Sequence, residues 1–77
     1  MSDYKPISCQ DYDKYEIAIL QRRNLHLIWR DTNVIYDQVV TPLNLQTRNG
    51  EEFLLVRNAN GDKFDVRLDR IRSSELR

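Results

Sequence analysis

The stretch LHLIWRDTNVIYDQVV, residues 25 to 40, decides the fold. Leu25, Leu27 and Trp29 stand at every second position, which is the period of a β-strand with one buried face. The polar triplet at residues 31–33 is a turn signal, and the apolar-rich run VIYDQVV follows it. The stretch therefore predicts a strand, a tight turn and a second strand.

The chain after this hairpin continues to indicate strands. Thr41-Pro42 predicts a bend or a strand end, because proline lacks the N–H that a central ladder needs, and residues 43–45 can continue the strand. A polar loop at Arg48-Asn49-Gly50 precedes the run EFLLVR at residues 52–57. Such a nearly continuous apolar run is typical of a strand covered on both sides or placed in a small closed barrel.

The last third of the sequence predicts another hairpin and an irregularity. Asn60-Gly61 is the strongest turn signal in the chain, since both residues tolerate a positive φ. Apolar residues follow at the even positions 64, 66 and 68, whereas Ile71 is odd. A bulge or sharp bend near residues 69–70 would return Ile71 to the core.

Upstream, the pattern predicts one helix over residues 9–22. Ser8 is placed as its N-cap, acids follow in the first turn, and Asn24 can end it. We therefore predict a mostly β domain with one N-terminal helix and a strongly bent antiparallel barrel. Its expected parts are a flexible end at 1–5, the helix at 9–22, the barrel at 25–72 and a tail at 73–77, all within a single domain, 1–77.

The predicted helix mixes acids with apolar residues. At about 100° per residue, Tyr12, Tyr15 and Ile19 share one stripe, and Asp13 and Glu16 border it. The side predicted to face solvent carries Asp11, Lys14, Ala18 and Arg22. Two alternatives remain for the acids: they are ordinary acids of a helix start at the edge of the core, or they are displayed for another molecule.

Composition restricts the possible functions. Twelve basic residues balance twelve acidic ones in 77 residues, so the chain lacks the positive excess of a dedicated nucleic-acid binder. The absence of a signal peptide or a long apolar run makes the cytoplasm the expected location. Cys9 is alone, so no internal disulfide can form, and it is expected to be a small buried hydrophobe.

Catalytic and cofactor chemistry finds little support. His26 is the only histidine and has no companion for a metal site, and the two glycines build no phosphate loop, so neither an enzyme nor a cofactor is expected. RNA binding is the more serious alternative. The aromatic side chains of Trp29, Tyr36 and Phe64 would stack on RNA bases. The basic side chains of Arg48, Arg57, Lys63 and Arg67 would hold phosphates. Interrupting acids and the alternation of the aromatics favour core packing instead.

Two parts of the sequence resemble the Rho-binding antiterminator (Rof) family of bacteria. The opening residues match the N-terminal signature as Tyr4-x-Pro6-Ile7-x-Cys9-x-x-Tyr12-Asp13-x-x-Glu16, and Leu68-Asp69-Arg70-Ile71 is similar to the closing strand. The resemblance implies an Sm-like fold with the N-terminal helix on a bent barrel. It also implies binding to the N-terminal domain of the termination factor Rho, obstruction of its RNA-binding surface and reduced Rho-dependent termination.

This resemblance implies a role for the acids of the helix in binding Rho. A surface that holds RNA is basic, so carboxylates on a rigid helix beside a tyrosine suit a protein that occupies it. We hypothesise that Asp11, Asp13 and Glu16 meet basic side chains of Rho and that Tyr12 anchors the helix, unless Tyr12 belongs to the core. Arg48 and Asn49 are a second, weaker contact candidate. The competing hypotheses are an Sm-like RNA-binding module and an interaction domain for another basic protein.

Overall fold

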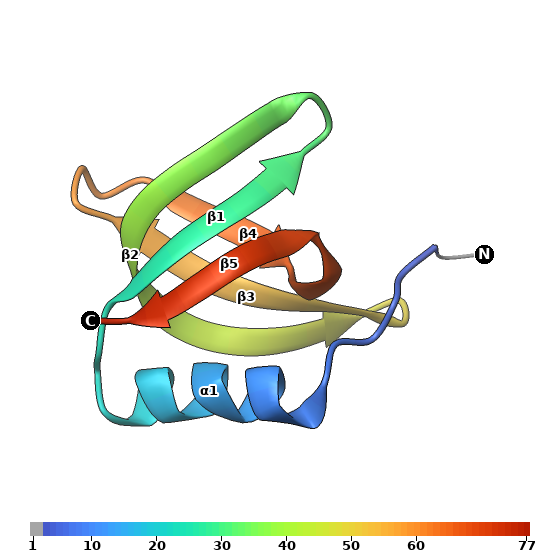
Figure 1. The fold of residues 1–77 in the computed structure, drawn as a ribbon, viewed down its shortest axis with the longest axis horizontal. Helices are drawn as coiled ribbons and strands as arrows, with labels where there is room; N and C mark the ends of the chain where they lie inside the picture. Colours follow the sequence, from blue (N-terminus) through green and yellow to red (C-terminus); the bar gives the residue numbers. More distant parts are fainter. Residues whose placement is uncertain (1–2) are drawn as a thin grey trace.

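The computed structural model describes residues 3–77 and shows one helix against a strongly bent five-stranded sheet (Figure 1). In chain order the elements are α1 (Cys9–Leu20), β1 (Leu25–Asp31), β2 (Val34–Arg48), β3 (Glu51–Asn58), β4 (Lys63–Arg67), the 3-10 turn η1 (Leu68–Arg70) and β5 (Ile71–Leu76). The strands are antiparallel in the order β4-β3-β2-β1-β5. The predicted fold class, mostly β with one N-terminal helix and a small bent antiparallel sheet, is confirmed.

The longest strand, β2, belongs to both halves of the sheet. Its residues 34–40 pair with β1 and its residues 40–48 pair with β3. Pro42 lies just beyond the β1 pairing, so its missing N–H breaks no ladder on that side. The register shifts between Pro42 and Asn44, and such a bulge bends a strand. The predicted bend is confirmed, whereas the alternative of a strand end is wrong.

The core lies inside this bend. Its buried hydrophobic residues, among residues 3–77, are Tyr15, Ala18, Leu25, Leu27, Trp29, Val40, Leu54, Val56, Val66 and Leu68. Trp29 is only 3% exposed, and its ring stacks on Tyr36 with centroids 4.9 Å apart, while Phe64 meets it edge-on at 5.5 Å. The three aromatic rings pack against one another, as predicted for core side chains.

The end of the chain is more regular than predicted. The turn after Asn58 uses Gly61 at φ 87°, and η1 supplies the irregularity that restores Ile71 to the core edge, as predicted. The expected tail at residues 73–77 is wrong, because β5 pairs with β1 as far as Leu76. Residues 72–75 of β5 are polar, so the sequence has no alternation of apolar residues there that would predict a strand. Pairing with the neighbouring β1 determines it instead.

Local chemistry sets both ends of α1. Ser8 is the N-cap, and its hydroxyl accepts a hydrogen bond from the Asp11 backbone N–H at 3.2 Å. The predicted end at residue 22 is two residues too far, because Arg22 takes φ 54° and closes the helix. The Arg23 N–H reaches back to the Ala18 carbonyl at 2.9 Å, which is the bond that defines a Schellman ending.

The side of α1 that faces the sheet differs from the prediction. Ala18, placed on the solvated side, is fully buried, and Lys14 beside it donates to the Ser74 carbonyl at 3.0 Å. Tyr15 also donates to the Ser74 hydroxyl, at 3.3 Å. The helix is therefore rotated so that part of its polar side lies against β5, and Ile17 is 43% exposed instead.

The N-terminal segment is held where the structure describes it. The Tyr4 hydroxyl donates to Glu52 at 3.1 Å, the Lys5 backbone N–H donates to Asp69 at 3.2 Å, and Asp3 pairs with Arg67 at 3.0 Å. The flexible end predicted for residues 1–5 is therefore wrong for residues 3–5. Residues 1–2 lie outside the described part of the chain.

Candidate protein-binding site

Asp13 and Glu16 lie on the exposed side of α1. Their spacing of three residues places both carboxylates on one face of the helix. Neither side chain forms an ion pair or a side-chain hydrogen bond with any residue from 3 to 77. Both carboxylates are therefore available to another molecule.

Tyr12 is half-buried between these acids and the sheet, and it lines two hollows. The larger, of about 340 Å³, is bounded by Tyr12, Glu16, Ile19, Leu20, Asn44 and Leu45. The smaller, of about 250 Å³, is bounded by Ile7, Cys9, Tyr12, Asp13 and Glu52. Each hollow combines apolar walls with at least one carboxylate, which suits a lysine or arginine side chain with its apolar stem and charged head.

Glu52 on β3 is a third acid of this region, which the sequence did not identify. It shares the smaller hollow with Asp13 and accepts the hydrogen bond from Tyr4. Burial raises the pKa of the Tyr12 phenol, and the negative charges of Glu52 and Glu16 raise it further. Only the placement of β3 beside α1 brings Glu52 there, so no local sequence signal could have revealed it.

Tyr12 fits both roles considered for it, a core residue and a contact for a partner. Its ring packs against the core cluster, and it reaches the surface in both hollows. A tyrosine held in this way adds contact area at small cost in entropy, because the fold already restricts its rotamer. It can therefore serve the core and a partner together.

Asp11 is separated from the other two helix acids. It is half-buried on the side of α1 that faces β5, and its carboxylate lies 3.8 Å from the Lys14 ammonium. Lys14 is in turn bound to Ser74. The structure thus places Asp13 and Glu16 with Tyr12, and Asp11 with the contacts of α1 to β5.

Arg48 and Asn49 lie at the hairpin between β2 and β3. The Arg48 guanidinium pairs with Asp65 at 2.9 Å and covers the Phe53 ring at 4.3 Å. Asn49 takes φ 52° and forms the turn. Neither residue lines the two hollows at Tyr12, so the structure does not bring this candidate together with the helix acids.

Cys9 differs from its prediction. The thiol belongs to the first turn of α1 and is exposed at the edge of the smaller hollow, not buried. The position of Cys9 on the first turn of α1, and not the apolar character of cysteine, decides its exposure here.

A second group of carboxylates surrounds Arg67 at the opposite end of the chain. Asp69 binds this guanidinium through two oxygens at 2.7 and 2.8 Å, and Asp3 and Glu51 add contacts at 3.0 and 3.3 Å. Hydrogen bonds from Arg67 hold the pKa of Asp69 below its ordinary value, although burial opposes the shift. Arg67, which the RNA alternative needs for a phosphate, is thus already bound.

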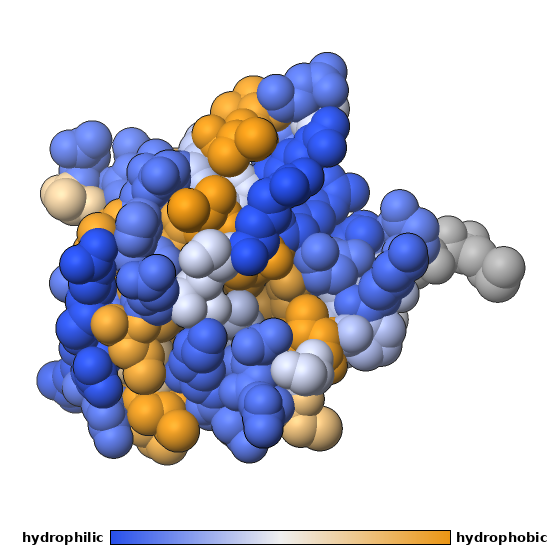
Figure 2. Space-filling model, viewed as in Figure 1, coloured by the Kyte–Doolittle hydropathy of each residue, from blue (hydrophilic) through white to orange (hydrophobic). Residues whose placement is uncertain are grey.

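The molecular surface is polar and finely divided. On the face drawn in Figure 2, apolar side chains form small patches between polar ones. Among residues 3–77, the large apolar residues that are exposed are Ile17, Leu20, Val34, Ile35, Val39 and Leu43. No helix among residues 3–77 has the length and apolar character needed to cross a membrane.

Comparison with solved structures supports the fold. Residues covering 96% of this chain superpose on the proteasome accessory factor B/C (PafBC) of Arthrobacter aurescens with a TM-score of 0.78 at 20% sequence identity. The match spans only 12% of that much longer chain. At this identity the similarity establishes a shared fold and nothing about function.

Comparison with protein families and curated proteins is more specific. The family described as "Modulator of Rho-dependent transcription termination (ROF)" matches residues 6–77. The chain is 34% identical over 70 residues to Protein rof of Escherichia coli strain K12 and to Protein rof of Shigella flexneri, covering 91% of this chain and 79% of each relative. This chain therefore belongs to the Rof family of modulators of Rho-dependent transcription termination.

Proposed function

We propose that this protein binds the N-terminal domain of Rho through the exposed face of α1 and obstructs the loading of RNA, which reduces termination. The observation that carries the proposal is the pair Asp13 and Glu16, exposed and without a partner among residues 3–77. Membership of the Rof family supplies Rho as the system on which the protein acts.

The chemistry of the two hollows supports a basic partner. A domain that holds RNA presents lysine and arginine side chains to phosphates. The hollows beside Tyr12 offer such side chains a carboxylate at the rim and apolar walls for the stem. Occupation of both would place α1 where the RNA backbone otherwise lies, so inhibition would be competitive with RNA.

A matched pair of charge reversals tests this proposal. In Asp13→Lys/Glu16→Lys the acids of the α1 face become basic, and we expect affinity for Rho to fall roughly a hundredfold or more at low salt. The measurement is fluorescence anisotropy of the labelled protein titrated with Rho hexamer, followed by competition against single-stranded RNA. Circular dichroism and thermal unfolding check that the fold is retained.

The control reverses two exposed acids that line neither hollow at Tyr12. Asp62→Lys/Glu75→Lys makes the same change in net charge on the β3–β4 turn and on β5, where both residues are exposed. We expect this variant to keep affinity within about threefold, since long-range charge effects are screened by salt. If the α1 variant still blocked RNA loading at full strength, or if both variants lost affinity equally, the acidic-face mechanism would be wrong.

A further inference from the structure

A group of arginines surrounds a hollow away from α1. The end of β1, the turn η1 and the start of β5 bound a space of about 370 Å³, lined by Arg30, Thr32, Asp69, Arg70 and Arg72. It shares no lining residue with the two hollows at Tyr12. Nothing in the binding of Rho through α1 uses this region.

The positive charges of this hollow are poorly compensated. No carboxylate among residues 3–77 forms an ion pair with Arg30 or Arg72, and Arg70 approaches Asp31 only at 3.7 Å. The Arg30 Nε donates to the Thr32 carbonyl at 3.1 Å. Asp69 is the one acid in the lining, and both of its oxygens are bound by Arg67. The hollow is therefore electropositive.

The backbone contributes to this arrangement. In the pairing of β1 with β5, Trp29 is opposite Ile71 and Ile28 is opposite Ser73, so Arg72 is the extra residue of a bulge. Bulges redirect a side chain, and here the redirected side chain lines the same hollow as Arg30 and Arg70. Three arginines from three elements thus line one space, where an anion would offset their positive charge.

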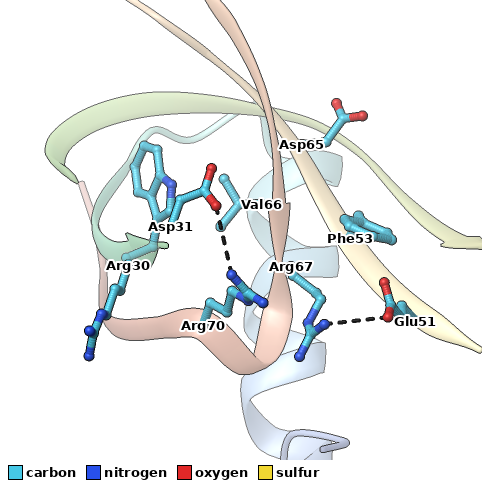
Figure 3. A pocket seen from close by; sticks show the side chains of 9 residues that line it. Arg30, Asp31, Glu51, Phe53, Asp65, Val66, Arg67 and Arg70 are labelled. Carbon is cyan, nitrogen blue, oxygen red and sulfur yellow. Dashed lines mark hydrogen bonds and ion pairs between the residues drawn. The ribbon is translucent and has the colours of Figure 1, made fainter. Parts of the chain in front are cut away.

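A second hollow of about 240 Å³ adjoins the first and shares Arg30 and Arg70 with it. Figure 3 shows Arg70 directed at Asp31 and Arg67 at Glu51, whereas Arg30 extends away from the carboxylates drawn. Trp29, Phe53 and Val66 give this second hollow apolar walls. Its rim carries the acids Asp31, Glu51 and Asp65. Trp29 and Val66 are only 3% and 2% exposed, so Phe53 is the part of this wall on which a nucleobase can pack, and the carboxylates can accept hydrogen bonds from its amino groups.

From these two hollows we infer a site for a phosphate-bearing ligand the size of one nucleotide, with the phosphate among Arg30, Arg70 and Arg72 and the base in the adjoining hollow. A phosphate group offers three or more acceptor oxygens, which can accept hydrogen bonds from arginines supplied by three elements. A carboxylate has two coplanar oxygens and is satisfied by one arginine. The ligand is a free nucleotide or one residue of single-stranded RNA.

Titrations with separate probes test the inference. Intrinsic fluorescence reports on this region, because Trp29 is the only tryptophan and, although 3% exposed, borders the base hollow. The probes are inorganic phosphate, adenosine and uridine monophosphate, a short oligouridine and a polyglutamate peptide, each at low and physiological salt. We expect a nucleoside monophosphate to bind more tightly than inorganic phosphate. Tighter binding of the oligouridine would assign the ligand to RNA, and equal or weaker binding would assign it to a free nucleotide.

Matched variants locate the site. Arg72→Gln should weaken nucleotide binding roughly tenfold, because it removes a charge-assisted hydrogen bond. Arg57→Gln removes the same charge from an exposed position on β3 outside both hollows and should change binding less than about twofold. The α1 variant Asp13→Lys/Glu16→Lys should retain nucleotide binding, which separates this inference from the proposed binding of Rho.

Three outcomes would overturn the inference. The first is the absence of a saturable signal with any phosphate-bearing probe, by fluorescence and by phosphorus NMR of the nucleotide. The second is equal loss of binding in Arg72→Gln and Arg57→Gln. The third is polyglutamate binding as tightly as the nucleotide, which would assign the hollow to an acidic protein.

Discussion

The carboxylates around Arg67 and those on the exposed face of α1 are the same chemical groups in opposite situations. Asp69 and Glu51 lie against Arg67, whose side chain is only 13% exposed. Asp13 and Glu16 face solvent without a partner in the described chain. The first group ties the N-terminal segment, β3, β4 and η1 together. The second contributes little to the fold and is free for another molecule.

The largest expected effect tests the stabilising group. Arg67→Met should cost about 2–4 kcal/mol of unfolding free energy, because the partly buried carboxylates of Asp69 and Glu51 lose the cation that they share. Urea unfolding at neutral pH measures the loss. The control Arg48→Met removes a pair whose side chains are 47% and 52% exposed, so it should cost less than about 1 kcal/mol. Similar losses in the two variants would remove the distinction between the two groups.

Acid pH should weaken the same group by an intermediate amount. The pKa of Asp69 is lower in the folded protein than in the unfolded chain, where an aspartate titrates near about 3.9. Its contribution is therefore complete above that value and is lost as the pH falls through the lowered folded pKa. Urea midpoints measured between about pH 7 and pH 2.5 should fall most steeply below about pH 4. Arg67→Met should flatten this dependence, and an unchanged slope in that variant would argue against Asp69 as its source.

The smallest expected effect tests the displayed group. Asp13→Asn/Glu16→Gln should leave the unfolding free energy within about 0.5 kcal/mol of the original, since exposed acids without partners contribute little. Thermal and urea unfolding measure this, and affinity for Rho measured on the same preparation should still fall. A stability loss above about 1 kcal/mol would mean that the fold itself uses these acids.

The sequence predicted most of the architecture because the decisive signals are local. Alternation identified β1, the turn residues identified the hairpins, and the capping pattern placed Ser8. The odd position of Ile71 revealed an irregularity that the structure provides as η1. Each of these features depends on residues within a few positions of one another.

The errors concern features that depend on distant neighbours. The buried side of α1 was misjudged at Ala18, because both sides of the helix carry apolar residues and only its position against β5 selects one. Residues 73–76 of β5 were predicted to belong to a tail, because the pairing of this strand with β1 is not encoded locally. Burial of Cys9 was expected from residue type, which does not report which side of the first helical turn faces solvent.

The candidate site divides in the same way. Asp13 and Glu16 could be proposed from the sequence because three positions on one helix fix their common face. Glu52 could not be proposed from the sequence, because it lies on β3 and only the fold brings it to the hollow that Asp13 lines. Arg48 and Asn49 were proposed from their loop, and the structure leaves them apart from Tyr12. Site residues that share one helix can be predicted from the sequence, whereas those brought together by the pairing of strands cannot.

The pairing of β1 with β5 has a kinetic consequence. Every other strand pair joins neighbours along the chain, whereas this one brings Leu25 to Leu76. Closing so long a segment costs more chain entropy than forming the hairpins, so we expect this pair to assemble last. Lys14 and Tyr15 donate hydrogen bonds to Ser74 of β5, so α1 forms these contacts only at that step. A nascent chain would then lack the contacts of Lys14 and Tyr15 with Ser74 until β5 has left the ribosome.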